Sequence, residues 1–121
     1  MATILVVDDE PAIRALIRAA LAKHTVLEAA DGLAALEVAR ARLPQLVLLD
    51  VALPALSGLE VCRRLKADPA TARTTVLLLT GLARPIGPTG ADGCIAKPFS
   101  PAAVVQQVEQ ALQRQAAPAG P

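Results

Sequence analysis

Residues 4–10 read Ile4-Leu5-Val6-Val7-Asp8-Asp9-Glu10, and residues 46–50 read Leu46-Val47-Leu48-Leu49-Asp50. Each stretch is a short apolar run that ends in a carboxylate, and such runs are typical of buried parallel strands. Two later runs, 76–79 and 94–96, end in Thr80 and in Lys97-Pro98. Because the carboxyl ends of the strands share one edge of an open α/β sheet, where ligands bind, these polar side chains are predicted to converge there.

The bulk composition excludes several classes of protein. The 121 residues are enough for one domain with its own core, and the net charge is only +1. There is no basic run, and Phe99 is the single aromatic residue, so this domain is not expected to bind nucleic acid. Neither a signal peptide nor a membrane-spanning run is recognisable, so a cytoplasmic protein without membrane contact is expected. Cys62 and Cys94 are predicted to be reduced and buried, and the single histidine, His24, argues against a zinc site.

Strand-like and helix-like segments alternate along the chain, which predicts βαβ units and a parallel sheet. Further strands are expected over residues 25–28 and 75–79. Pro11, Asp31-Gly32 and Ser100-Pro101 are typical of helix starts. The apolar faces of the four expected helices are Ile13, Leu16, Ile17, Ala20 and Leu21; Ala35, Leu36, Ala39 and Leu43; Gly58, Val61, Cys62 and Leu65; and Val104, Val105, Val108, Ala111 and Leu112.

One segment interrupts this alternation. Residues 81–93 contain two prolines and four glycines, a composition that does not support a helix of ordinary length. A loop with at most one helical turn is predicted there, in place of a full helix. The rest of the chain is predicted to form one domain over residues 1–115, followed by a flexible tail over residues 116–121.

The predicted convergence of acids has a chemical consequence. Three carboxylates a few ångströms apart raise one another's pKa unless a cation lies among them, and oxygen ligands select Mg²⁺ or a similar ion. If Asp9 and Asp50 hold the ion, the second oxygen of Asp50 is free to attack a phosphoryl group. The ion and the Lys97 ammonium would neutralise the phosphoryl oxygens, and Thr80 could donate a hydrogen bond to them.

Each of these residues also has an ordinary structural explanation. The acids at positions 8–10 could cap the first helix, and Asp50 could be a turn residue. Thr80 could simply end its strand, and Lys97 could be a solvated side chain. The order favours a site, because an acid pair, a single acid, a hydroxyl and a lysine follow four different strands.

These residues resemble a known family, the receiver domain of bacterial response regulators. The resemblance covers about residues 3–114 and is carried by Val7-Asp8-Asp9-Glu10-Pro11, by Leu49-Asp50-Val51-Ala52-Leu53-Pro54 with Ser57-Gly58, by Leu79-Thr80-Gly81 and by Ala96-Lys97-Pro98-Phe99. It implies an α/β, flavodoxin-like, doubly wound sheet of five parallel strands in the order 2-1-3-4-5. It also implies that Asp50 accepts a phosphoryl group from a sensor histidine kinase or a phosphotransfer protein. A downstream effector protein or a fused output domain would then respond.

The resemblance also implies roles for the other residues. Asp9, Asp50 and the main-chain carbonyl of Ala52 would bind Mg²⁺, or Mn²⁺ as an alternative, and Asp8 would hold a water molecule on the metal. Thr80 and Lys97 would contact the phosphoryl group, with a cis peptide bond between Lys97 and Pro98. Such a domain is no general enzyme, since it catalyses only its own phosphorylation and dephosphorylation.

Two features depart from the family pattern. The position three residues before Lys97 is usually an aromatic residue that moves together with the threonine, and here it is Cys94. Thr80 and Cys94 are therefore the expected switch residues. The interval from Thr80 to Lys97 is 17 residues, several fewer than usual, and it includes the proline- and glycine-rich segment. The family's usual output surface is expected to be altered.

Two other functions are compatible with some of these observations. A phosphorylation-independent adaptor could keep the acidic pocket as a relic of the fold. A flavin- or nucleotide-binding protein of the same architecture is disfavoured, because the loop Asp8-Asp9-Glu10-Pro11 repels phosphates and lacks the glycines that would surround them.

Overall fold

Five strands and four helices make up the part of the chain that the structure, a computed structural model, describes: residues 1–81 and 90–116. The strands are β1 (Thr3–Val7), β2 (Thr25–Ala29), β3 (Leu46–Asp50), β4 (Thr75–Thr80) and β5 (Gly93–Ala96). The helices are α1 (Pro11–Ala20), α2 (Gly32–Arg42), α3 (Gly58–Ala67) and α4 (Pro101–Ala116).

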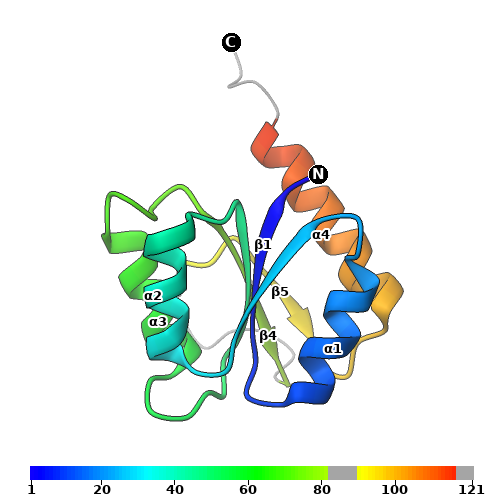
Figure 1. The fold of residues 1–121 in the computed structure, drawn as a ribbon, viewed down its shortest axis with the longest axis horizontal. Helices are drawn as coiled ribbons and strands as arrows, with labels where there is room; N and C mark the ends of the chain where they lie inside the picture. Colours follow the sequence, from blue (N-terminus) through cyan, green and yellow to red (C-terminus); the bar gives the residue numbers. More distant parts are fainter. Residues whose placement is uncertain (82–89, 117–121) are drawn as a thin grey trace.

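The strands form one parallel sheet in the order β2-β1-β3-β4-β5, as predicted. In Figure 1 this sheet lies between the helices, with α2 and α3 on one side and α1 and α4 on the other. In the register of the sheet, Val7 lies opposite Leu49 and Thr80 lies opposite Ala96. The carboxyl ends of the central strands are therefore level with one another. This alignment brings polar residues that are far apart in the sequence to a single edge.

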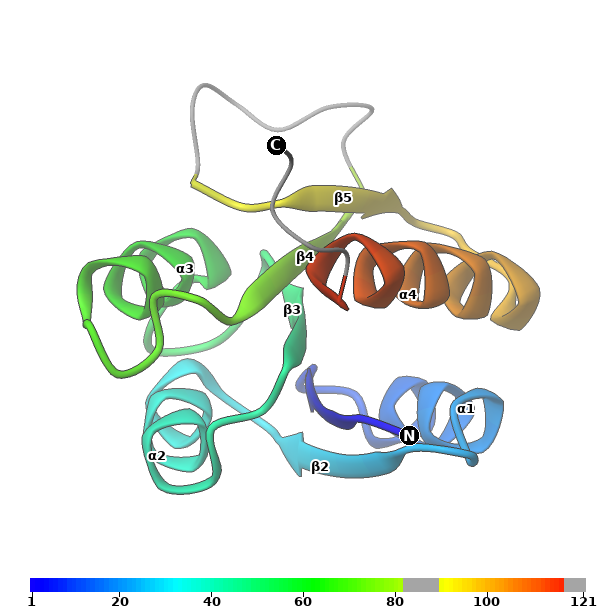
Figure 2. The same cartoon turned by 90° about the horizontal axis from the view of Figure 1, so that it is seen from above.

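Alternate residues of each strand pack on opposite faces of the sheet, and each face is covered by two helices. Figure 2 shows α1 and α4 on one face and α2 and α3 on the other. Successive residues of the central strands are buried on both faces, which explains why β1, β3 and β4 read as continuous apolar runs. The α1/α4 face includes Ile4, Val6, Leu46, Leu48, Leu77 and Leu79, and the α2/α3 face includes Leu5, Val7, Val47, Leu49, Val76 and Leu78.

Local side-chain contacts explain where the helices begin. Asp31 accepts a hydrogen bond from the Ala34 amide at 2.8 Å, and Ser57 accepts one from the Glu60 amide at 3.3 Å. Ser100 accepts one from the Ala103 amide at 3.1 Å, which confirms the start predicted at Ser100-Pro101. These caps set the positions at which α2, α3 and α4 leave their loops.

Two residues predicted to lie on buried helix faces are instead exposed. The prediction for Leu16 was wrong because its side chain, 40% exposed, lines an open pocket between α1 and the segment after β5. The prediction for Leu43 was wrong because α2 ends one residue earlier. Leu43 takes the left-handed C-cap conformation, with φ of 47°, and is 55% exposed.

The predicted loop over residues 81–93 and the predicted tail fall largely on residues 82–89 and 117–121, which lie outside the described part of the chain. On the described side of this loop, the Asp92 carboxylate accepts hydrogen bonds from the Lys66 ammonium at 2.9 Å and from the Val76 amide at 2.8 Å. The start of β5 is thus tied to α3 and β4. Within residues 1–81 and 90–116, no helix has both the length and the apolar surface needed to cross a bilayer.

Candidate functional site

The carboxyl edge of the sheet brings together four of the residues that the sequence singled out. Asp8 directly follows β1, Asp50 ends β3, Thr80 ends β4, and Lys97 directly follows β5. Asp8, Asp50 and Thr80 are nearly inaccessible to solvent, with exposed fractions of 0%, 4% and 5%. Buried carboxylates are rare unless a cation or a hydrogen-bond donor compensates for the lost hydration. The two buried acids at this edge therefore require such a partner.

Lys97 supplies the positive charge that connects the two buried acids. Its ammonium lies 3.1 Å from Oδ2 of Asp50 and 3.6 Å from Oδ2 of Asp8. Burial alone would lower the pKa of Lys97, but the hydrogen bond to Asp50 and the charges of both acids outweigh it, so this pKa is raised. The Lys97 amide also donates to the Thr80 carbonyl at 2.7 Å, and the Lys97–Pro98 peptide bond is cis, as the resemblance implied.

The Asp8 carboxylate is only partly satisfied. Its Oδ1 accepts a hydrogen bond from the Glu10 amide at 2.9 Å. Its Oδ2 is the one buried side-chain oxygen or nitrogen within residues 1–81 and 90–116 that has no hydrogen-bond partner. Burial raises the pKa of Asp8, with smaller contributions from Asp50 and Asp9, against the opposing effects of the Glu10 amide and Lys97. The geometry leaves a buried oxygen facing the site with capacity for a further cation.

Asp8, Asp9 and Glu10 form a group that fits a divalent metal ion. One carboxylate oxygen of each lies within 4.8 Å of the other two, and Asp9 and Glu10 are exposed while Asp8 is buried. An all-oxygen, carboxylate-rich donor set suits Mg²⁺ or Mn²⁺, and the unpartnered Oδ2 of Asp8 gives a second reason to expect a cation. Asp50 lies close to this group, because the Lys97 ammonium contacts both Asp50 and Asp8.

Glu10 was not among the metal ligands expected from the sequence. The alternative role expected for the acids at 8–10, that of capping α1, is not seen for the side chain of Glu10. Glu10 occupies the N-cap position of α1, but its side chain makes no capping hydrogen bond. The signal that could have identified Glu10 is its position directly after the two aspartates, with Pro11 already starting the helix.

Asp50 is positioned by its own loop. Its Oδ1 accepts a hydrogen bond from the Ala52 amide at 3.1 Å, while Oδ2 faces Lys97. Gly58 packs directly against the main chain here, because a Cβ at that position would overlap the carbonyl oxygen of Asp50. The Gly58 amide donates to the Val51 carbonyl at 2.9 Å. The glycine after Ser57 is thus needed for α3 to start this close to the end of β3.

The two residues predicted to form the switch lie on adjacent strands. Thr80 is buried at the end of β4, and Cys94 is half-buried in β5, where it packs against the α2/α3 side of the core. Burial raises the pKa of the Cys94 thiol. Cys62 is fully buried in α3, and the two cysteines are not joined by a disulfide, in agreement with the predicted reduced state.

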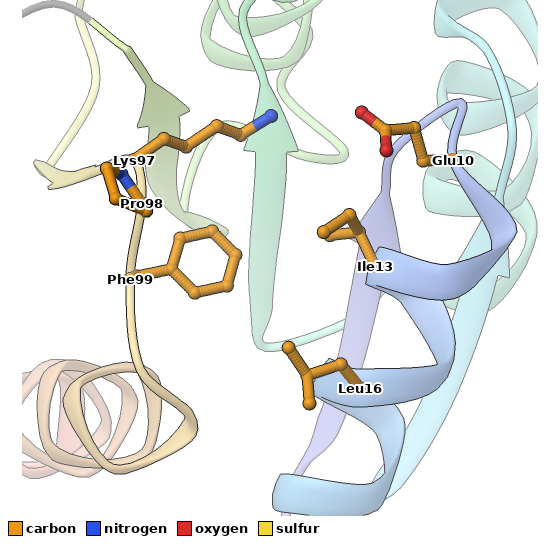
Figure 3. A pocket seen from close by; sticks show the side chains of 6 residues that line it. All are labelled: Glu10, Ile13, Leu16, Lys97, Pro98 and Phe99. Atoms are coloured by element: carbon orange, nitrogen blue, oxygen red, sulfur yellow. The ribbon is translucent and has the colours of Figure 1, made fainter.

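A pocket with a volume of about 340 Å³ opens beside the acidic group, between α1 and the segment that follows β5. Figure 3 shows the Lys97 ammonium and the Glu10 carboxylate pointing toward each other across its mouth, with Ile13, Leu16 and Phe99 below them. Its lining residues are Glu10, Ile13, Leu16, Lys97, Pro98 and Phe99. The charged site therefore borders an apolar recess.

Comparison with known families gives a match over most of the chain. The family model described as "Response regulator receiver domain" matches residues 4–109. The phosphate regulon transcriptional regulatory protein PhoB of Pseudomonas aeruginosa is 41% identical over 119 residues, which cover 93% of this chain and 52% of PhoB. The chain thus spans about half the length of the curated relatives it matches.

Solved structures give the same result. The chemotaxis response regulator CheY4 of Vibrio cholerae has a TM-score of 0.86 and 29% identity, covering 92% of this chain and 98% of CheY4. The signal receiver domain of a signal transduction histidine kinase from Syntrophus aciditrophicus has a TM-score of 0.90 and 26% identity, covering 100% of this chain and 97% of that domain.

Proposed function

The chain belongs to the response regulator receiver domain family of two-component signalling, and from this premise we propose that Asp50 accepts a phosphoryl group from a phosphohistidine. Domains of this family are signalling modules and not general enzymes. The donor in this proposal is a sensor histidine kinase or a phosphotransfer protein. In the transfer, an Asp50 oxygen forms a bond to phosphorus while the bond between phosphorus and the histidine nitrogen breaks.

The observation that carries the proposal is the position of Lys97 between two buried acids. Its ammonium is 3.1 Å from the Asp50 carboxylate, so a positive charge is already present where the phosphoryl oxygens would arrive. Phosphoryl transfer depends mainly on alignment and on the neutralisation of charge on those oxygens. Thr80 would donate a hydroxyl hydrogen bond to the same oxygens from the end of β4.

The metal in this proposal is Mg²⁺, or Mn²⁺ in its place. Asp8, Asp9 and Glu10 offer the closely spaced carboxylates. Asp50 at the end of β3 and the Ala52 carbonyl in the loop that follows would complete the ligand set. When bound, the ion supplies positive charge that offsets the negative charge of the phosphoryl oxygens. The residues of the chain have three other roles. Asp50 attacks the phosphorus atom, Lys97 pairs with a phosphoryl oxygen and the Ala52 amide orients the Asp50 carboxylate.

The output of the domain follows from the added charge. A phosphoryl group on Asp50 would draw Thr80 and Lys97 toward it, and Cys94 would respond in β5 without the ring movement of an aromatic residue. A downstream effector, or an output domain of a longer protein joined to the receiver domain of residues 1–115, would detect this change. In this proposal the receiver domain itself does not contact nucleic acid.

The test is the mass of the intact chain after incubation with acetyl phosphate and Mg²⁺. We expect the addition of one phosphoryl group to the wild-type chain and none to Asp50→Asn. Glu37→Gln is the matched control, because it removes one exposed carboxylate from α2, far from the carboxyl edge. This control should be modified to the same extent as the wild type.

Two results would contradict the proposal. Equal modification of Asp50→Asn would move the phosphoacceptor to another residue. No modification of the wild type, and no binding of beryllofluoride, would favour the phosphorylation-independent adaptor instead.

A further inference from the structure

Arg14 of α1 contacts the main chain of the acidic loop. Its Nη1 donates a hydrogen bond at 2.6 Å to the carbonyl oxygen of Asp8, and its Nε lies 3.1 Å from Oε1 of Glu28 on β2. The side chain is only 17% exposed. This arginine therefore joins three elements, α1, β2 and the end of β1, at the base of the candidate metal site.

The Asp8 carbonyl lies just beyond the last paired residues of the sheet. The ladder between β1 and β2 ends with Val7 opposite Ala29, and the Asp8 amide still donates to the Ala29 carbonyl at 3.2 Å. After that point β2 gives way to the loop that leads into α2. The arginine thus provides the donor that a longer β2 would otherwise supply, and a buried carbonyl needs such a donor.

This hydrogen bond holds the peptide unit that links Asp8 to Asp9. On the other side of Asp8, the carboxylate Oδ1 accepts from the Glu10 amide at 2.9 Å. The backbone between the first and third acids is therefore fixed from both sides, by Arg14 at the carbonyl and by Asp8 at the amide of Glu10. The relative positions of the three carboxylates depend on both contacts.

The charge of Arg14 is compensated locally. Glu28 lies 3.1 Å from Arg14 through one oxygen and 2.6 Å from Arg18 of the same helix through the other. A bare guanidinium beside a metal site would repel the incoming ion. Because Glu28 pairs with Arg14, the arginine can hold the loop while repelling an incoming cation less strongly.

We propose that Arg14 is a positioning residue for the divalent metal site: it orients the Asp8–Asp9 peptide unit so that the carboxylates of Asp8, Asp9 and Glu10 converge. This inference rests on the metal dependence in the proposed function. The arginine itself touches neither the metal nor the phosphoryl group. Its effect reaches them through the geometry of the loop.

The test is the dissociation constant for Mg²⁺, measured by isothermal titration calorimetry on the full chain. Arg14→Met removes the hydrogen bond to the Asp8 carbonyl and should weaken Mg²⁺ binding about tenfold or more, in line with the loss seen when supporting contacts of metal sites are removed. The change in charge alone predicts the opposite change in affinity, because removing a positive charge near a cation site should strengthen Mg²⁺ binding.

Arg18→Met is the matched control. It removes an arginine of the same helix that pairs with the same Glu28 and changes the net charge by the same amount. Within the described part of the chain, the Arg18 guanidinium contacts Glu28 and not the acidic loop. We expect its Mg²⁺ affinity to stay within about twofold of wild type. Arg14→Lys keeps a positive charge and a donor, and it should recover most of the affinity lost in Arg14→Met.

The outcomes separate this inference from the proposed function. A wild-type chain that binds no Mg²⁺ would contradict the metal dependence itself. A wild-type chain that binds Mg²⁺ while Arg14→Met binds as tightly or more tightly, or weakens only as much as Arg18→Met, would overturn the role of Arg14 alone. So would an Arg14→Lys chain that binds as weakly as Arg14→Met.

A second measurement needs no variant, in case Arg14→Met does not fold. Because coupling between two interactions is reciprocal, Mg²⁺ must strengthen the Arg14 hydrogen bond if that bond favours Mg²⁺ binding. Hydrogen exchange of the Arg14 guanidinium, followed by NMR, should therefore slow when Mg²⁺ is added, while that of Arg18 should not. Unchanged exchange at Arg14 in the metal-bound chain would contradict the inference.

Discussion

The polar side chains at the two edges of the sheet differ in how fully they are paired. At the amino edge, His24 accepts a hydrogen bond from the Ala2 amide at Nδ1 and binds Oε1 of Glu109 at 2.7 Å through Nε2. The hydrogen bond from His24, together with Lys23, lowers the pKa of Glu109. Gln45 accepts from the Thr3 amide at 3.0 Å. Each of these groups has found a partner within the protein itself.

At the carboxyl edge the pairing is incomplete. A single ammonium, that of Lys97, is shared between Asp50 and Asp8, and Oδ2 of Asp8 has no hydrogen bond. The amino edge thus stabilises the fold through its own contacts, whereas the carboxyl edge keeps a buried carboxylate oxygen that a bound cation would neutralise. Sites of this kind commonly reduce the stability of the free protein.

The largest effect is expected from Gly58→Ala, which tests how closely the carboxyl edge is packed. A methyl group there would overlap the carbonyl oxygen of Asp50, which belongs to the main chain and cannot simply turn aside. We expect the free energy of unfolding to fall by about 3 kcal/mol, as measured by urea denaturation.

Gly81→Ala is the control for this variant. Gly81 follows Thr80 at the same edge, but an added Cβ would meet no atom of residues 1–81 and 90–116 within 4 Å. We expect its free energy of unfolding to change by less than about 0.5 kcal/mol. Equal losses in the two variants would show that the close approach of Gly58 to Asp50 is unimportant.

The next effect compares Lys97→Met at one edge with His24→Leu at the other. Lys97→Met leaves Asp50 and Asp8 buried without their cation, so stability in EDTA should fall by about 2 kcal/mol, a value reduced for the 27% exposure of the lysine. Mg²⁺ should restore much of this loss in thermal denaturation, because a second cation replaces the first.

His24→Leu replaces a side chain that is 4% exposed, so the Ala2 amide and the Glu109 carboxylate each lose their hydrogen bond to the imidazole. Stability should fall by about 2 kcal/mol as well, but by the same amount in EDTA and in Mg²⁺. If Mg²⁺ rescued both variants alike, or neither, the proposed difference between the edges would be wrong.

The smallest effect is a gain in stability. Because burial raises the pKa of Asp8 in the folded state above the ordinary 3.8, its charged form costs stability above that value, and the cost is relieved as pH falls through the raised pKa. Asp8→Asn should therefore raise the free energy of unfolding in EDTA at pH 7 by about 1 kcal/mol.

Urea denaturation at several pH values checks this prediction. The difference between Asp8→Asn and the wild type should shrink as the solution becomes acidic. Mg²⁺ should stabilise the wild type more than the variant. A variant that is less stable than the wild type at neutral pH would show that Asp8 is already satisfied by Lys97.

The sequence predicted most of the fold because the deciding signals are local. The apolar run at residues 46–50 coincides with β3, and the expected strand at 25–28 is one residue shorter than β2. Ser100 caps α4 as expected. The exposure of Leu16 could not be predicted, because its position on the apolar stripe of α1 is the same whether or not a neighbour covers it.

The site was predictable at the level of strand ends, and less so in its contacts. Each of Asp8, Asp50, Thr80 and Lys97 follows an apolar run, so topology alone brings them to one edge. The contact of Lys97 with both acids was less predictable, because it depends on the conformation of the long lysine side chain. The contact of Arg14 with the Asp8 carbonyl has no sequence signal, because a main-chain acceptor is the same at every residue.

The last turn of α4 is fastened to the amino edge, where Gln115 donates to the Gln45 carbonyl at 2.8 Å and to the Thr75 hydroxyl at 3.2 Å. Five-residue strands separate this point from Asp50 by about 15–20 Å. A partner protein that docks on the end of α4 is thus too far away to contact Asp50. The packing of α4 against α1 and the sheet connects that end of the helix to the carboxyl edge.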